Sequence, residues 1–206
     1  MLKNKSALLI AILLLISCSS KSINYAELNS FDQNNNLQAV VEIPVGTNDK
    51  IEYNPLNNHF EQDTLKGAPR IIQFLGYPVN YGFIPSTVMN KNQDGDGDPL
   101  DALILGKPLK TGQIISVKPI GLLKMKDGGE LDNKILGIPV HEKYQTLNIK
   151  NFKDLSQNHP KLREIIGEWF LNYDNTSKIE ILGWTDEAMA LKEVEKWQTS
   201  KANTGG

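Results

Sequence analysis

The stretch Asp94-Gly95-Asp96-Gly97-Asp98-Pro99-Leu100-Asp101 places four carboxylates within eight residues and runs directly into the apolar segment Ala102-Leu103-Ile104-Leu105-Gly106. The apolar segment ends at a glycine, which predicts a buried strand. Four like charges this close repel one another, and they stay ionised together only if cations lie among them. Oxygen ligands of this kind suit Mg²⁺, Mn²⁺ or Ca²⁺. The stretch therefore predicts a divalent-metal site at the start of a strand. A solvated acidic turn is the alternative, because Asp-Gly repeats are common in turns.

Several other metal and nucleotide sites do not fit the chain. An EF-hand register that puts Gly97 at its sixth position puts Leu103, and not glutamate, at its twelfth. The three histidines, His59, His141 and His159, lack the spacing of zinc ligands. No Gly-x-x-x-x-Gly-Lys-Ser/Thr loop is present, which argues against a P-loop nucleotide enzyme.

The first residues have the pattern of an export signal. Lys3 and Lys5 precede an unbroken apolar run over residues 7–16, which is too short to span a bilayer as a stable helix. Leu15-Ile16-Ser17-Cys18 resembles a bacterial lipobox, in which cleavage exposes a cysteine that is then acylated. We therefore predict a lipoprotein signal peptide over residues 1–17 and lipidation of Cys18. An ordinary signal peptide followed by a chance cysteine is the alternative.

Lipidation would place the protein outside the cytoplasm, as a membrane-anchored lipoprotein of the bacterial periplasm or cell envelope. Several acyl chains on one residue give stable anchoring. Residues 18–37 begin at the chain's only cysteine and are mostly polar, which predicts a flexible tether between the lipid anchor and the domain.

Residues 38–200 have the length of one domain. The formal net charge is −2 for the whole chain and falls to −4 once Lys3 and Lys5 are removed with the signal peptide. A mildly acidic domain without a basic patch argues against a nucleic-acid partner.

The apolar pattern predicts a mainly β (α+β) domain: a small five-stranded, OB-like closed β-barrel with two C-terminal α-helices packed outside it. Pro160 is favourable at the start of the first helix, and Thr185-Asp186-Glu187 caps the second, over residues 188–197. Residues 54–64 are expected to form a polar loop. The expected strands cover residues 38–44, 50–53, 70–75, 102–105, 113–125, 134–140 and 178–182, and the apolar stripe of the first helix consists of Leu162, Ile165, Ile166, Trp169 and Phe170.

Polar side chains lie at the edges of these strands without a packing reason. They combine carboxylates, which hold metals, with Lys, Arg and Tyr, which hold phosphate oxygens. Any one of them alone is more typical of a surface ion pair or a turn. The set consists of Glu42, Lys50, Glu52, Arg70, Tyr77, Tyr81, Asp127, Asp132 and Lys134.

On these residues the chain resembles the family I (soluble) inorganic pyrophosphatases. The family signature is Asp-x-Asp-Pro-x-Asp followed by an apolar residue, and the chain has Asp96-Gly97-Asp98-Pro99-Leu100-Asp101-Ala102. The resemblance runs in order from Ala39 to Trp197. It includes Val41-Glu42-Ile43-Pro44, Lys50-Ile51-Glu52, Lys66-Gly67-Ala68-Pro69-Arg70, Asn80-Tyr81-Gly82-Phe83-Ile84-Pro85 and Asp132-Asn133-Lys134.

The resemblance implies hydrolysis of inorganic pyrophosphate to two phosphates by a water that Mg²⁺ activates, with several ions in the site and Mn²⁺ as a substitute. It also implies a homo-oligomer, either a hexamer or a dimer. By resemblance, Asp98 is the general base and Tyr77 positions it or its water. The implied metal ligands are Asp96, Asp101, Asp127, Asp132, Glu42 and Glu52, and the implied phosphate-binding residues are Lys50, Arg70, Tyr81, Lys134 and Tyr173.

One position departs from the family pattern. The family usually has Tyr-Lys after the helix, whereas this chain has Tyr173-Asp174. An acid at this place would weaken one phosphate contact. Two other functions stay open: a cation-binding lipoprotein without catalysis, which this departure favours, and a phosphohydrolase for larger phosphate esters.

Overall fold

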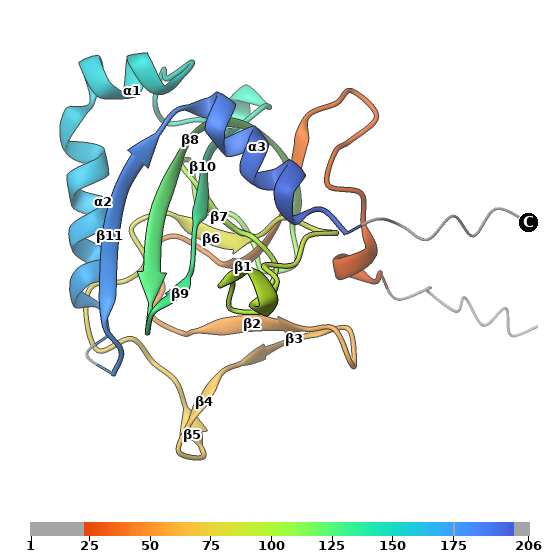
Figure 1. The fold of residues 1–206 in the computed structure, drawn as a ribbon. Coiled ribbons are helices and arrows are strands. Elements are labelled where there is room, and N and C mark those ends of the chain that lie inside the picture. The colour runs from red at the N-terminus through yellow and green to blue at the C-terminus, as the bar shows by residue number, and fades with distance from the viewer. Residues whose placement is uncertain (1–22, 175, 200–206) are drawn as a thin grey trace, which may run out of the picture.

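The segment that follows the acidic stretch forms β7 (Asp101–Ile104), inside a seven-stranded sheet, so that the predicted buried strand is confirmed (Figure 1). The computed structural model describes residues 23–174 and 176–199. The predicted signal peptide and Cys18 lie outside the described residues. Within those ranges, no helix is long and apolar enough to cross a membrane.

Five strands of the main sheet form a closed ring. Their order is β1-β6-β7-β10-β8, and β8 also pairs with β1. Neighbours in the ring are antiparallel except β7 and β10, which are parallel. Two further strands, β11 and β9, pair with β8 outside the ring. The strands besides β7 are β1 (Leu37–Ile43), β6 (Asn80–Phe83), β8 (Ile114–Asp127), β9 (Glu130–Leu131), β10 (Lys134–Pro139) and β11 (Ile179–Thr185).

The ring is apolar on both faces. On β7, Ala102 and Ile104 belong to one buried cluster, and Leu103 belongs to the other. This alternation follows from the two-residue period of a strand. A strand that is buried on both faces reads as a continuous apolar run, which is why residues 102–105 gave a clear signal.

Gly82 lets β1 and β6 approach closely. A Cβ at Gly82 would lie 1.9 Å from the carbonyl oxygen of Val40. The two strands pair there, with Gly82 opposite Val41. Because any other residue would force the strands apart, Gly82 fixes the position of its neighbour Tyr81 at the pocket.

Among the described residues, three α-helices pack against the sheet, rather than the two predicted. The missed helix is α1, which Asn151 caps through a bond from Asp154 N (2.9 Å). It has only seven residues and ends just before Pro160, so it is too short to show a clear helical period. The α-helices are α1 (Phe152–Asn158), α2 (Pro160–Asn172) and α3 (Glu187–Trp197), and the short 3₁₀ helices are η1 (Tyr25–Glu27), η2 (Lys91–Gln93) and η3 (Glu142–Tyr144).

The helices cover the two apolar clusters separately. Helix α3 crosses β8 and contributes Ala190, Val194 and Trp197 to one cluster. Helix α2 lies beside β11 and contributes Ile166 and Trp169, among others, to the other cluster (Figure 1).

Two predicted segments have a different structure. Residues 54–64, predicted as a loop, contain most of the hairpin of β2 (Ile51–Asn54) and β3 (His59–Gln62). Residues 70–75, predicted as a strand, form a bend with one isolated bridge, Ile71 to Asp49. The apolar side chains that suggested a strand include Leu75, which is 70% exposed. The chain instead pairs just earlier, in the small hairpin of β4 (Thr64–Leu65) and β5 (Ala68–Pro69).

The predicted tether is too long, because its described part packs on the domain. The hydroxyl of Ser30 is buried and donates to Pro85 O (2.7 Å). Tyr25 packs edge-on against Tyr53 and Phe60, with ring centres 5.5 and 5.0 Å away. These contacts join segments far apart in sequence, so the polar composition of residues 23–36 gave no sign of them.

Candidate active site

A cavity of about 770 Å³ opens between the β2–β3 hairpin, the acidic loop and the ends of β8 and β10. All predicted site residues of the described chain except Arg70 line it. They are Glu42, Lys50, Glu52, Tyr77, Tyr81, Asp96, Asp98, Asp101, Asp127, Asp132, Lys134 and Tyr173.

Hydrogen bonds and the burial of Leu100 fix the backbone of the acidic loop before and after Asp98. Asp98 O accepts from Met89 N (2.8 Å), and Asp98 N donates to the Asp96 carboxylate (2.9 Å). Gly97 has φ +93, a conformation that favours glycine, and its N–H donates to Met89 O (2.7 Å). Leu100 is fully buried and anchors the end of the loop. The loop therefore presents Asp96 and Asp98 from a fixed backbone.

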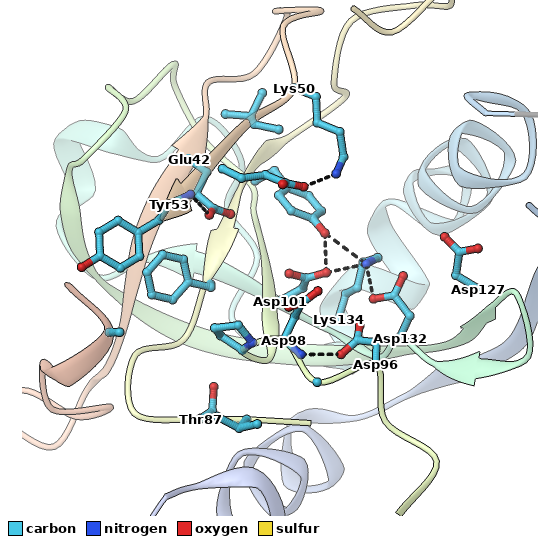
Figure 2. Close-up of a pocket in the computed structure, with 18 of the residues that line it drawn as sticks. Glu42, Lys50, Tyr53, Thr87, Asp96, Asp98, Asp101, Asp127, Asp132 and Lys134 are labelled. Carbon is cyan, nitrogen blue, oxygen red and sulfur yellow. Dashed lines mark hydrogen bonds and ion pairs between the residues drawn. The ribbon is translucent and has the colours of Figure 1, made fainter. Parts of the chain in front are cut away.

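Lys134 joins the carboxylate at the start of β7 to the carboxylate that lies just before β10. Its Nζ lies 2.6 Å from Asp101 Oδ2 and 2.7 Å from Asp132 Oδ1 (Figure 2). The Tyr81 hydroxyl lies 3.2 Å from the same Nζ and donates to Asp101. The register of β7 and β10 explains the contact, because Lys134 is directly opposite Asp101. Asp127, at the end of β8, lies apart from this network (Figure 2).

Most of the charged side chains in the cavity are carboxylates, and three of the aspartates have raised pKa values. Burial raises the pKa of Asp96 to about 6. Burial and the nearby charge of Asp101 raise the pKa of Asp98. Burial also raises the pKa of Asp132 despite its ion pair, because Asp132 shares the single charge of Lys134 with Asp101. Burial alone would lower the pKa of Lys134, but the two carboxylates raise it.

The opposite wall carries two glutamates and a lysine. Glu42 on β1 is buried and accepts from Tyr53 N (2.8 Å) on β2. Its burial raises the pKa of Glu42 to about 8. Lys50 donates to Glu52 and lies 3.6 Å from Asp63 Oδ2. The predicted Lys-x-Glu pair is thus an ion pair on the cavity wall.

Aromatic rings form the wall below Lys134. Tyr173 stacks on Trp169 with ring centres 4.6 Å apart and planes 11° from parallel. Tyr77 packs against Trp169 (4.6 Å) and Tyr81 (5.5 Å). Among the described residues, Tyr77 forms no hydrogen bond to Asp98, so its contacts place it as a support for the neighbouring rings.

Arg70 is the one predicted site residue of the described chain that does not line the cavity. Its guanidinium donates to Asp63 Oδ2 (3.1 Å) and to Asp174 Oδ2. Asp63 was missed as a site residue. The turn Lys66-Gly67, with φ of 54° and 81°, has the chemistry of a two-residue hairpin loop and could have placed residue 63 opposite residue 70.

Thr87 was also missed. It is buried and lines the cavity, and its hydroxyl accepts from Leu100 N (2.9 Å) while donating to Ile84 O (2.6 Å). Thr87 thereby secures the end of the acidic loop. No spacing in the sequence connects it to that loop.

The comparisons with known proteins agree on one family. The family model for inorganic pyrophosphatase matches residues 39–202. An inorganic pyrophosphatase from Synechocystis is 37% identical over 163 residues, which cover 78% of this chain and 88% of that protein. The chain belongs to the inorganic pyrophosphatase family.

Solved structures of inorganic pyrophosphatases share the fold. The enzyme from Thermus thermophilus matches with a TM-score of 0.70 and 29% identity, over 84% of this chain and 95% of that chain. A truncated vacuolar soluble pyrophosphatase from Trypanosoma cruzi, solved in complex with pyrophosphate, matches with a TM-score of 0.72 and 25% identity, over 92% of this chain and 73% of that chain.

The cavity of this inorganic pyrophosphatase family member fits divalent ions. Among the described residues, no three Asp, Glu, His or Cys side chains converge as a ready-made cage. Mg²⁺ does not require one, because it keeps several waters and binds through one or two carboxylates. Burial, and after it the neighbouring carboxylates, raises the pKa values of Asp96, Asp98 and Asp132. A divalent ion would stabilise these groups as carboxylates.

Proposed function

We propose that this protein hydrolyses inorganic pyrophosphate to two phosphates with Mg²⁺, or with Mn²⁺ as a substitute. One observation carries the proposal: in a chain of the inorganic pyrophosphatase family, the predicted carboxylates and cations surround one cavity. Bound to Asp96, Asp101, Asp127 and Asp132, with Glu42 and Glu52 around them, Mg²⁺ would neutralise pyrophosphate and lower the pKa of a water.

The residues of the chain would supply position and proton transfer. Phosphoryl transfer depends on positioning and electrostatics more than on covalent chemistry. Lys50, Lys134, Tyr81 and Tyr173 would hold the phosphate oxygens. Asp98, in the cavity lining, would take a proton as the water's oxygen bonds to one phosphorus. The bond from that phosphorus to the bridging oxygen breaks, and the second phosphate leaves.

Release of phosphate from pyrophosphate with Mg²⁺ tests the proposal. We expect activity from the wild type and a loss of about 10²–10⁴-fold for Asp98→Asn, the usual range for a general base. Asp94→Asn is the matched control. Asp94 is exposed and has φ 63, a conformation that asparagine tolerates, so this variant should stay near wild type. An inactive wild type would reject the function, and equal rates for Asp98→Asn and Asp94→Asn would reject the role of Asp98.

The same assay separates the two alternatives. A non-catalytic cation-binding protein would bind Mg²⁺ without releasing phosphate. A phosphohydrolase for larger esters would act on nucleotides or sugar phosphates about as fast as on pyrophosphate. We expect pyrophosphate to be hydrolysed much faster than either.

We also propose that the five-stranded ring is an OB-like closed barrel and that the protein is a homo-oligomer. Closure of the ring through the β1–β8 pairing supports the barrel. Exposed apolar side chains on α2 and β11, such as Ile165 and Leu182, support self-association. Light scattering coupled to size-exclusion chromatography tests the oligomer, and a monomer at micromolar concentration would reject it.

We further propose export and anchoring through acylated Cys18, which would make the protein an extracytoplasmic lipoprotein of the periplasm or cell envelope. The support is the charged start, the apolar run and the lipobox-like ending of the sequence. Labelling of bacteria with a radioactive fatty acid should mark the wild type but not Cys18→Ser. An unlabelled wild type would contradict lipidation.

A further inference from the structure

The main chain of Arg70 is fixed directly beside the cavity. Arg70 O accepts from Lys50 N (3.1 Å), and Arg70 N donates to Asp63 O (2.7 Å). Lys50 itself lines the cavity. Arg70 therefore stands next to a cavity residue, and only its long side chain decides whether its charge reaches the cavity.

Two carboxylates from different parts of the chain hold this side chain. Asp63 accepts from Nη1 (3.1 Å), and Asp174 accepts from Nη2. Each carboxylate is oriented by its second oxygen, which accepts from Thr64 N (2.6 Å) and Thr176 N (2.8 Å) respectively. The guanidinium is thus held by two pre-oriented partners and is absent from the cavity lining.

The two carboxylates together carry more charge than the guanidinium. Lys50 Nζ also lies 3.6 Å from Asp63 Oδ2, whereas Asp174 has Arg70 as its ion-pair partner, so an anion that approaches Arg70 must compete above all with Asp174. The guanidinium attracts a phosphate fully only after it has left one carboxylate. The side chain of Asp174 is 10% exposed, so water screens this contact only in part.

Asp174 is the partner that Arg70 would leave. Asp63 faces Arg70 across the small β4–β5 hairpin and is bonded to its main chain, so the two residues move together. Asp174 lies 104 residues away, directly after the cavity residue Tyr173. A shift of the guanidinium from Asp174 toward a phosphate in the cavity would therefore give up the bond to Asp174 and keep the contact with Asp63.

We propose that Asp174 is a positioning residue that competes with phosphate groups for Arg70 and so keeps product phosphate weakly bound. The inference rests on the proposed pyrophosphatase function. In this interpretation Asp174 competes with phosphate for Arg70, in addition to replacing the family's lysine that would contact phosphate.

Calorimetric titration with inorganic phosphate in Mg²⁺ buffer tests the competition without turnover. We expect Asp174→Asn to bind phosphate about three- to tenfold more tightly, the size expected for loss of a partly buried ion pair. The KM for pyrophosphate should fall by a similar factor, with a smaller change in kcat. Asp174→Glu, which restores the carboxylate, should return phosphate affinity to within about twofold of wild type.

Controls separate competition at Arg70 from a general charge effect. Glu180→Gln also removes one negative charge, but Glu180 pairs with the exposed Lys178, so it should leave phosphate affinity unchanged. In an Arg70→Ala background, Asp174→Asn should have no further effect. If Asp174→Asn folds poorly, Asp174→Ser keeps an oxygen for Thr176 N and takes its place.

The proposal is overturned if Asp174→Asn leaves phosphate affinity unchanged or weakens it. It is also overturned if the gain persists without Arg70. An inactive wild type in the pyrophosphate assay would instead reject the proposed function, and the phosphate titrations would remain interpretable.

Discussion

Lys134 Nζ lies between two carboxylates, 2.6 Å from Asp101 and 2.7 Å from Asp132, and only 2% of the lysine side chain is exposed. Removing one member of a buried charge cluster leaves the others uncompensated. Lys134 therefore links the stability of the fold to the charge of the site.

We expect Lys134→Met to destabilise the metal-free protein by about 3–5 kcal/mol, the range for breaking a buried ion pair. Mg²⁺ should recover part of this loss, because it would supply positive charge to Asp101 and Asp132. Urea unfolding with Mg²⁺ and with EDTA measures both effects. Lys178→Met, at an exposed ion pair, is the control and should change little. Equal unfolding free energies for the two variants would contradict the role of Lys134.

We expect the contribution of Glu42 to the stability of the protein to fall as the pH rises. Burial raises its pKa from about 4.5 to about 8. The folded state therefore binds the proton more tightly than the unfolded chain, and this contribution is complete below about pH 4.5 and lost as the pH rises through 8. In metal-free buffer, Glu42→Gln should be more stable than wild type at pH 8 by a few kcal/mol, since one pKa unit is about 1.4 kcal/mol.

Urea unfolding between pH 5 and 8 tests the role of Glu42, because the advantage of Glu42→Gln should shrink as the pH falls. Glutamine keeps an oxygen for Tyr53 N, so the substitution changes mainly the charge. Glu61→Gln is the matched control, since Asn54 and Asn57 lower the pKa of this exposed group. A pH profile shared by both variants would disprove the assignment to Glu42.

The parts of the fold that local pattern determines were predictable from the sequence. The run from Ala102 to Leu105 is apolar at every position because both faces of β7 are buried, and it was placed correctly. The turn Asp127-Gly128-Gly129-Glu130 also has a local cause, since both glycines have positive φ between the paired strands β8 and β9. The family resemblance supplied the residues that line the cavity, which no single spacing identified.

The rest depends on contacts between distant segments. In the sequence, Asp174 stands out only because it departs from the Tyr-Lys pattern of the family. Its bond to Arg70 spans 104 residues. Neither residue carries a local signal of the other. Exposed apolar residues such as Phe74 and Leu75 imitated a strand, because a pattern of residue types does not show burial.

The N-terminal segment should stabilise the domain. A chain that begins at residue 37 should unfold at lower urea concentration than one that begins at residue 23, because it lacks the contacts of Tyr25 and Ser30. Ser30→Ala alone should cost about 1–3 kcal/mol, since it leaves the buried Pro85 carbonyl without its partner. Ser177→Ala, at an exposed serine, is the control. Equal stability of the two chains would show that these contacts contribute nothing to the stability of the domain.

The C-terminal helix should influence the site through Asn133. This buried residue lies between Asp132 and Lys134, just before β10, and Asn133 Nδ2 donates to Glu193 Oε1 on α3 (2.8 Å). The same oxygen accepts from Trp197 Nε1 (2.7 Å), and Asn133 Oδ1 accepts from Met125 N (3.1 Å). Glu193 thus holds in place the segment that carries two cavity residues.

Glu193→Ala should leave both donors without a partner and destabilise the protein by about 1–3 kcal/mol. It should also lower kcat for pyrophosphate, because small displacements of reacting groups can cost up to about 10²-fold. Glu193→Gln keeps an acceptor oxygen and should lose less stability and less activity. Glu195→Ala, two residues away and exposed, should lose neither. Urea unfolding and saturating-substrate kinetics separate the two effects. If Glu193→Ala lowers stability without changing kcat, the contact supports the fold alone. If Glu193→Ala matches Glu195→Ala in stability and in kcat, the contact has no role, because unpaired buried donors should lower stability and a shift of Asp132 should lower kcat.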